Sequence, residues 1–248
     1  HDFPNAANGL GMSSSPVISK GVLIAQVEND ADSFTTGINL NNGETIWKNE
    51  RPKGANWTSP VLLGIGPTQK VALQSLKGIS IINPSTGEEF WDYQDGASTI
   101  PSSTPVQDIL LVPSNGLTAL KSLPGGNSHT QLWQDNKLGP GTGSPVISGD
   151  RILVINKANV LTCAKVETGE ILWRMRIKGP ASGSPVATTS HLYFFNEDGL
   201  GQIIKLTDKE GEVVSTIELE ETILCTPALA ETALFIRSDK HLWKISQN

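Results

Sequence analysis

A motif that recurs at a nearly constant interval most constrains how this chain of 248 residues can fold. Each copy opens with Ser or Thr followed by Pro, and successive prolines of the motif lie 40 to 45 residues apart. They are Pro16, Pro60, Pro105, Pro145, Pro185 and Pro227. Such an interval is typical of proteins in which each repeat forms one small unit that packs on its neighbours. The chain is therefore predicted to be a repeat protein.

A tryptophan marks the same place in four of the copies. It follows the proline by 31 residues in the first two copies and by 28 in the third and fourth. These residues are Trp47, Trp91, Trp133 and Trp173. The fifth copy has Ser215 at this place, and Trp243 is expected in the third strand of the last copy. Because a large, flat indole fills space well between packed sheets, the four tryptophans in phase are predicted to be wedges between copies.

The fourth copy shows how one repeat is organised. Its runs of Val, Ile, Leu and Thr are separated by Gly, Asp and Asn, a pattern that predicts short strands joined by tight turns. Proline is tolerated where it opens the first strand, because that residue need not donate a ladder hydrogen bond. The predicted strands are 144–147, 151–156, 160–166 and 170–177. Four strands per copy predict an all-β fold, a β-propeller of four-stranded antiparallel blades with about six blades visible.

The repeats predict a single domain over residues 1–248. Their bounds are about 12–50, 57–95, 102–136, 142–177, 182–219 and 224–248, and the last copy has only three predicted strands. Phe3 lies 13 residues before Pro16. Trp47 precedes Pro60 by the same interval, so residues 1–4 are a candidate fourth strand for the last copy. Two interpretations stay open, namely a closed ring of six blades and part of a larger propeller of eight.

Charge and hydropathy exclude two kinds of partner. The chain has 19 Lys and Arg against 25 Asp and Glu, a net charge of −6, and no long basic run. Nucleic-acid binding depends on clustered Lys and Arg, so no nucleic-acid partner is predicted. No apolar stretch approaches the roughly 18 residues of a membrane span, so no transmembrane segment is predicted in this chain.

Residues that could carry catalysis or bind metal are scarce. The chain has four histidines and only two cysteines, Cys163 and Cys225, which is too few and too scattered for a zinc site or a disulfide framework. The acidic residues 30–33 lack the EF-hand spacing and are predicted to form a solvated turn. Residues 139–143 are glycine-rich but lack the Lys-Ser/Thr ending of a phosphate loop, so they are predicted to be a linker. No catalytic, cofactor-binding or metal-binding residue is predicted.

The fourth copy resembles a known repeat. Ser144-Pro145-Val146-Ile147 and the segment from Lys165 to Trp173 are similar to the pattern SPV…ALDxxTGxxLW of the PQQ-like, quinoprotein-type propeller family. This family includes the outer-membrane assembly lipoprotein BamB and the quinoprotein alcohol dehydrogenases. The resemblance extends over essentially the whole chain, and it implies an exported bacterial protein with a periplasmic or other extracytoplasmic location.

The resemblance leaves three functions to weigh. A BamB-like member would be a non-enzymatic scaffold that binds another protein or a peptide, and this interpretation is favoured. A quinone-dependent dehydrogenase of the family would need an adjacent Cys-Cys pair, a carboxylate base and calcium ligands, whereas Cys163 and Cys225 lie in different copies. No cofactor is therefore predicted. A small-ligand or carbohydrate-binding propeller is the remaining alternative, with Trp57, which is out of phase with the repeat, as a candidate surface platform.

Overall fold

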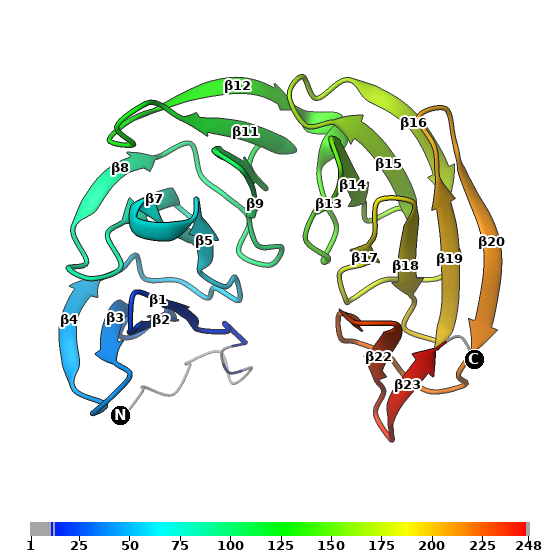
Figure 1. Ribbon diagram of the computed structural model, residues 1–248, viewed down its shortest axis with the longest axis horizontal. Coiled ribbons are helices and arrows are strands. Elements are labelled where there is room, and N and C mark those ends of the chain that lie inside the picture. Colours follow the sequence, from blue (N-terminus) through cyan, green and yellow to red (C-terminus); the bar gives the residue numbers. More distant parts are fainter. Residues whose placement is uncertain (1–10, 12, 247–248) are drawn as a thin grey trace. The chain divides into compact units, whose positions relative to one another are not determined.

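A computed structural model describes residues 11 and 13–246 as a succession of β-strands (Figure 1). The only helices among these residues are two single-turn 3-10 helices, η1 (Gly66–Thr68) and η2 (Asn136–Leu138). The described strands form five antiparallel sheets of four strands and one of three. The predicted all-β class and the four-stranded antiparallel blades are confirmed. Neither helix is long enough to cross a lipid bilayer.

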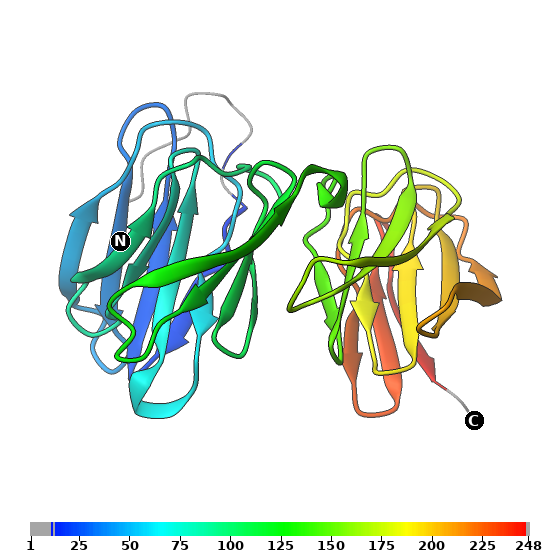
Figure 2. The same ribbon diagram turned by 90° about the horizontal axis from the view of Figure 1, so that it is seen from above.

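The chain divides into two compact units, His1–Gln134 and Asp135–Asn248, and the first holds three sheets. Strands pair in chain order within each sheet, and in each unit they run between two layers of loops (Figure 2). The strands of this unit are β1 (Val17–Ser19), β2 (Val22–Val27), β3 (Phe34–Asn39) and β4 (Thr45–Glu50); β5 (Val61–Leu63), β6 (Lys70–Ser75), β7 (Gly78–Ile82) and β8 (Glu89–Tyr93); and β9 (Thr104–Val106), β10 (Ile109–Val112), β11 (Leu117–Ser122) and β12 (His129–Asp135).

The second unit holds the other three sheets, of which the last has three strands. Its strands are β13 (Val146–Ser148), β14 (Arg151–Ile155), β15 (Val160–Lys165) and β16 (Ile171–Arg176); β17 (Val186–Ala187), β18 (His191–Phe195), β19 (Leu200–Leu206) and β20 (Gly211–Glu218); and β21 (Ala228–Ala230), β22 (Ala233–Arg237) and β23 (Leu242–Ser246). The strands predicted for the fourth copy are confirmed to within two residues at each end. Trp243 lies in β23, the third strand of its sheet, as expected.

Burial within a sheet depends on the position of the strand. The second strand of the fourth copy, β14, is buried along Ile152–Ile155, so both of its faces are covered by protein. In the outermost strand, β16, only Trp173 is buried. Outermost β4 repeats this pattern, with Trp47 as its single buried residue. Continuous apolar runs therefore mark inner strands, and a lone Trp among polar residues marks an outer one.

The hydroxyl side chain of the Ser/Thr-Pro motif links neighbouring sheets. In three pairs of adjacent copies, the first with the second, the fourth with the fifth and the fifth with the sixth, the backbone N–H of the motif Ser donates to the hydroxyl of the corresponding Ser or Thr in the next copy. The pairs are Ser15 with Ser59 at 2.9 Å, Ser144 with Ser184 at 2.8 Å, and Ser184 with Thr226 at 3.0 Å. The following proline has no N–H to leave unsatisfied. The motif therefore satisfies the backbone where one sheet meets the next.

Three of the four repeat tryptophans, Trp47, Trp91 and Trp173, also contact the neighbouring sheet. The indole N–H of Trp47 donates to the carbonyl of Pro84 at 3.0 Å, and that of Trp173 donates to the carbonyl of Thr207 at 2.8 Å. Both acceptors lie in or next to the turn before the outermost strand of the following sheet. Trp91 differs, because its buried N–H has no partner among the described residues and its ring lies 4.4 Å from that of His129.

Two predictions concern how the strands are grouped into domains. The candidate fourth strand at residues 1–4, on which the prediction of a closed ring depends, lies outside the described residues. The repeat bounds, and the prediction that they form a single domain, also remain predictions beside the two compact units.

Candidate functional site

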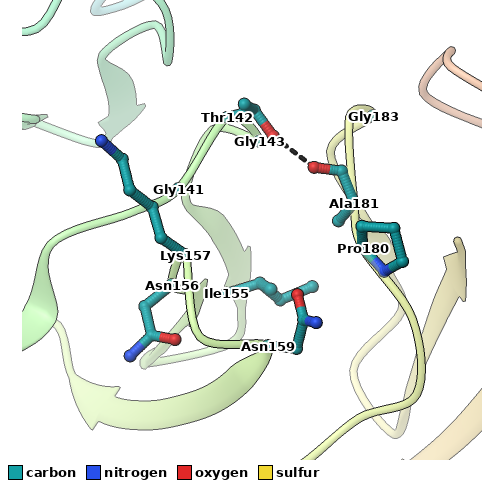
Figure 3. A pocket seen from close by; sticks show the side chains of 10 residues that line it. All are labelled: Gly141, Thr142, Gly143, Ile155, Asn156, Lys157, Asn159, Pro180, Ala181 and Gly183. Atoms are coloured by element: carbon teal, nitrogen blue, oxygen red, sulfur yellow. Dashed lines mark hydrogen bonds between the residues drawn. The ribbon is translucent and has the colours of Figure 1, made fainter. Parts of the chain in front are cut away.

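A pocket of about 190 Å³ lies in the second unit, where three loops of the fourth and fifth copies meet (Figure 3). The first loop is the linker that leads into β13, the second is the turn between β14 and β15, and the third is the linker from β16 to β17. The lining residues are Gly141, Thr142, Gly143, Ile155, Asn156, Lys157, Asn159, Pro180, Ala181 and Gly183. All of these come from loops or strand ends, which are the parts of a propeller that vary without disturbing its sheets.

Local hydrogen bonds fix the turn that forms one wall. The side-chain oxygen of Asn156 accepts from the backbone N–H of Ala158 at 2.9 Å and of Val160 at 3.1 Å. Asn159 has a φ of 56°, a left-handed conformation that asparagine adopts more readily than most residues. The N–H of Gly141 donates to the carbonyl of Ile155 at 2.8 Å. Turn and linker therefore hold each other in place.

The pocket has an apolar floor and a polar rim. Ile155 and Asn159 lie on the side of the turn that faces Pro180 and Ala181, and Lys157 extends past the linker on the other side (Figure 3). The hydroxyl of Thr142 donates to the carbonyl of Ala181, which ties the two linkers together across the pocket. Such a combination of apolar surface and a few polar groups is typical of ligand sites.

The segments that contain the lining residues are positively charged in an acidic protein. Residues 136–143, 156–159 and 178–183 include three lysines and no Asp or Glu. These are Lys137, Lys157 and Lys178, of which Lys157 lines the pocket; all three are exposed, and none belongs to an ion pair of the described residues. The adjacent carboxylate of Glu197 accepts a hydrogen bond from Ser182 at 2.8 Å.

The charge at one repeat position is reversed in the fourth copy. Twelve residues after the repeat proline, the first, fifth and sixth copies have acidic residues, whereas the fourth has Lys157. The acidic residues are Glu28, Glu197 and Asp239. This difference reverses the sign of the charge at this position of the repeat. It changes which charge a partner meets at this loop.

The corresponding place in the first copy is filled by side chains. Ala181 and Asn56 each lie four residues before the next repeat proline, and Lys157 and Glu28 each lie twelve residues after the proline of their own copy. The amide of Asn56 donates to Glu28 at 2.8 Å and to the carbonyl of Gln74 at 2.8 Å. At position 181 the side chain is a single methyl group, which makes no such hydrogen bonds.

A buried ion pair adjoins these hydrogen bonds of Asn56 in the first copy. Arg51 Nε lies 2.7 Å from Glu28 Oε1, and both side chains are less than a tenth exposed. Burial raises the pKa of the Glu28 carboxyl, while Arg51 and the amides of Asn56 and Gln26 oppose the rise. This cluster is structural, because its polar groups are used in contacts between β2, β6 and the linker after β4.

The residues singled out from the sequence are not gathered at the pocket. The four repeat tryptophans lie in β4, β8, β12 and β16, and five of the six repeat prolines directly precede the first strand of their sheet, while Pro105 lies within β9. Trp57 belongs to the first unit, in the linker between β4 and β5. It is half-buried, and its backbone N–H donates to the carbonyl of Thr99 at 2.9 Å.

The residues present do not fit the quinone and calcium site that the family's dehydrogenases would need. Cys163 is buried in β15, where burial raises the pKa of its thiol to about 11. Cys225 lies in the linker before β21 with its sulfur 3.0 Å from the carbonyl of Arg237, and both thiols are free. Among the described residues, no three His, Cys, Asp or Glu side chains come together as a metal site. The acidic residues 30–33 form a turn whose N–H groups bond to Asn29.

Comparison with known proteins agrees with the fold. Residues 117–221 match the family described as outer membrane protein assembly factor BamB. The solved structure of BamB from Moraxella catarrhalis is similar with a TM-score of 0.72 and 16% identity, covering 90% of this chain and 68% of that one. The computationally designed Ika8 protein is similar with a TM-score of 0.73 and 11% identity, covering 95% and 73%. No curated protein sequence matches the chain.

The six sheets, together with the similarity to these solved structures, identify the fold as a β-propeller built from repeats. Over residues 117–221, the predicted resemblance to the PQQ-like, BamB-like repeat family is confirmed. That segment contains β15, β16 and the residues of the pocket.

Proposed function

We propose that this protein is a non-enzymatic propeller scaffold that binds a partner protein in the bacterial cell envelope. The observation that carries the proposal is the pocket of the fourth copy, which is lined by loop residues that include the exposed Lys157, whereas Asn56 and Glu28 hydrogen-bond to each other in the first copy. The family match to BamB supports both an assembly role and an envelope location. A scaffold of this kind needs a shaped surface on its loops and no catalytic residues.

The two alternatives have less support. The dehydrogenase hypothesis lacks a Cys-Cys pair in the sequence, and the described residues contain no metal-binding cluster of His, Cys, Asp or Glu. The carbohydrate-binding hypothesis rests on Trp57, which is half-buried and partly engaged through its backbone. Neither alternative uses the pocket.

Photo-crosslinking in the bacterial host tests the proposal. A photo-reactive amino acid in place of Lys157 is expected to crosslink a defined protein that fractionates with the cell envelope. The matched control is the same amino acid in place of Lys209, an exposed lysine in the turn between β19 and β20. Equal crosslinking at both positions, or none at position 157, would contradict the proposal.

A further inference from the structure

We propose that Asn115 is a site of spontaneous hydrolytic modification, at which the side-chain amide becomes a carboxylate without the help of an enzyme. Asn115 and Gly116 lie in the turn between β10 and β11. The sequence has two further Asn-Gly pairs, at 8–9 and at 42–43, and the first of these lies outside the described residues. The proposal does not depend on which partner the scaffold binds.

The reaction needs only the chain itself and water. The backbone nitrogen of Gly116 attacks the side-chain carbonyl carbon of Asn115, and a C–N bond forms while the amide nitrogen leaves as ammonia with the proton that the Gly116 nitrogen loses. Water then opens the resulting cyclic imide at either of its carbonyls, so the product is aspartate or its isomer isoaspartate. Glycine hinders this attack least, because it has no side chain and its backbone is the most permissive.

The turn leaves the reacting groups of Asn115 and Gly116 unrestrained. Asn115 is exposed, and its amide nitrogen makes one hydrogen bond, at 3.5 Å to the hydroxyl of Ser114, which is longer than most such bonds. Neither the side-chain oxygen of Asn115 nor the backbone N–H of Gly116 has a hydrogen-bond partner among the described residues. Their φ angles of 48° and 90° are typical of a tight hairpin turn. No hydrogen bond therefore holds the attacking nitrogen.

The second Asn-Gly pair of the described residues provides an internal comparison. Asn42 is also exposed, in the turn between β3 and β4, but there the Gly43 N–H donates to the carbonyl of Asn39 at 2.8 Å. The Asn42 amide donates to the carboxylate of Glu44 at 2.8 Å, and its oxygen accepts from the Glu44 N–H at 3.1 Å. These bonds have to open before the nitrogen attacks, so Asn42 is expected to react more slowly than Asn115.

Modification would disturb a hairpin whose strands are buried. Residues 109–112 of β10 and 117–120 of β11 are buried, and Ser114 beside the modified residue is only 3% exposed. Isoaspartate adds one carbon atom to the backbone of the turn, and the geometry of a hairpin turn sets the register of its two strands. We therefore expect the modified hairpin to open more often than the original one.

Peptide mapping of the aged protein tests the proposal. The whole protein is kept for days at mildly alkaline pH and digested, and tandem mass spectrometry then locates each exchange of NH2 for OH, while chromatography separates aspartate from isoaspartate. Asn115 is expected to be converted about tenfold or more faster than Asn42, because each hydrogen bond that has to open slows the attack. In urea, where both turns are unfolded, the two rates should become equal.

Two variants assign the modification and its effect. Asn115→Gln, which lengthens the side chain, is expected to remove the conversion at position 115 and leave that at Asn42 unchanged. Its matched control, Asn42→Gln, should leave the conversion at Asn115 unchanged. Hydrogen exchange of the backbone in β10 and β11 is expected to become faster in the aged protein and in aged Asn42→Gln, but not in aged Asn115→Gln.

Equal rates at Asn115 and Asn42 in the folded protein, or no conversion at Asn115, would overturn the proposal. Aspartate without isoaspartate at position 115 would also overturn it, since direct hydrolysis of the amide yields aspartate alone. Unchanged hydrogen exchange after conversion would contradict the expected effect on the hairpin. Circular dichroism verifies that the variants are folded, and the comparison of Asn115 with Asn42 in the unaltered chain keeps the test valid if Asn115→Gln unfolds.

Discussion

Replacing Trp173 by alanine is expected to lower the free energy of unfolding by about 3–5 kcal/mol, as for other buried aromatic residues. The indole is only 8% exposed and belongs to the apolar cluster between the fourth and fifth sheets. It packs closely over Gly211 and donates to the carbonyl of Thr207. The variant would leave a cavity and an unsatisfied carbonyl. Urea unfolding followed by circular dichroism measures the loss.

Two control variants separate packing from hydrogen bonding. Trp173→Phe keeps most of the ring but removes the N–H, so its cost is expected to be about 1–2 kcal/mol. Ser215→Ala changes the exposed residue at the corresponding place in the fifth copy and should have almost no effect. If Trp173→Ala costs no more than Ser215→Ala, the assignment of this tryptophan as a wedge between sheets is wrong.

Replacing Arg51 by methionine is expected to cost about 3–5 kcal/mol, because it leaves Glu28 buried without its counter-ion. Burial raises the pKa of Glu28 above its usual 4.5, and Arg51 opposes that rise. In the variant the opposing attraction is gone and the pKa rises further. The folded state then binds a proton more tightly than the unfolded state, so stability falls as pH increases above about 4.5. The cost should therefore be small in acid and large at neutral pH.

The control for this prediction removes both charges. Combining Arg51→Met with Glu28→Gln keeps a hydrogen-bond acceptor for Asn56 but leaves no buried charge. The double variant is expected to recover most of the lost stability and to lose the added pH dependence. Urea midpoints measured from acid to neutral pH provide the comparison. A single variant whose cost is the same at every pH would show that the ion pair is not what holds this cluster together.

Local patterns in the sequence are sufficient to predict the strands and the repeat architecture. Turn residues and β-branched runs predicted the strands of the fourth copy to within two residues, because short-range propensity and burial agree there. The Ser/Thr-Pro motif was found from its spacing alone. Its cause became visible only in the structure, where the Ser144 N–H bonds to the hydroxyl of Ser184 in the next copy.

The candidate site was not predicted, because it is assembled from three loops that are distant in the sequence. Residues 139–143 were correctly expected to form a linker, but nothing local indicated that they face Asn159 and Ala181 across a pocket. One sequence signal was available. In an acidic chain, the three loop segments around this pocket carry lysines and no Asp or Glu. Aligning the copies on their prolines also exposes the change from Glu28 to Lys157.

Filling the pocket tests the central claim that this site is where the partner binds. The photo-reactive amino acid at position 157 is combined with Ala181→Leu, which fills the pocket, and the protein is irradiated in the bacterial host. The crosslinked envelope protein is expected to disappear in this variant, whereas Lys209→Glu in place of Ala181→Leu leaves it unchanged. A crosslink that persists unchanged when the pocket is filled would show that the partner binds elsewhere and would contradict the claim.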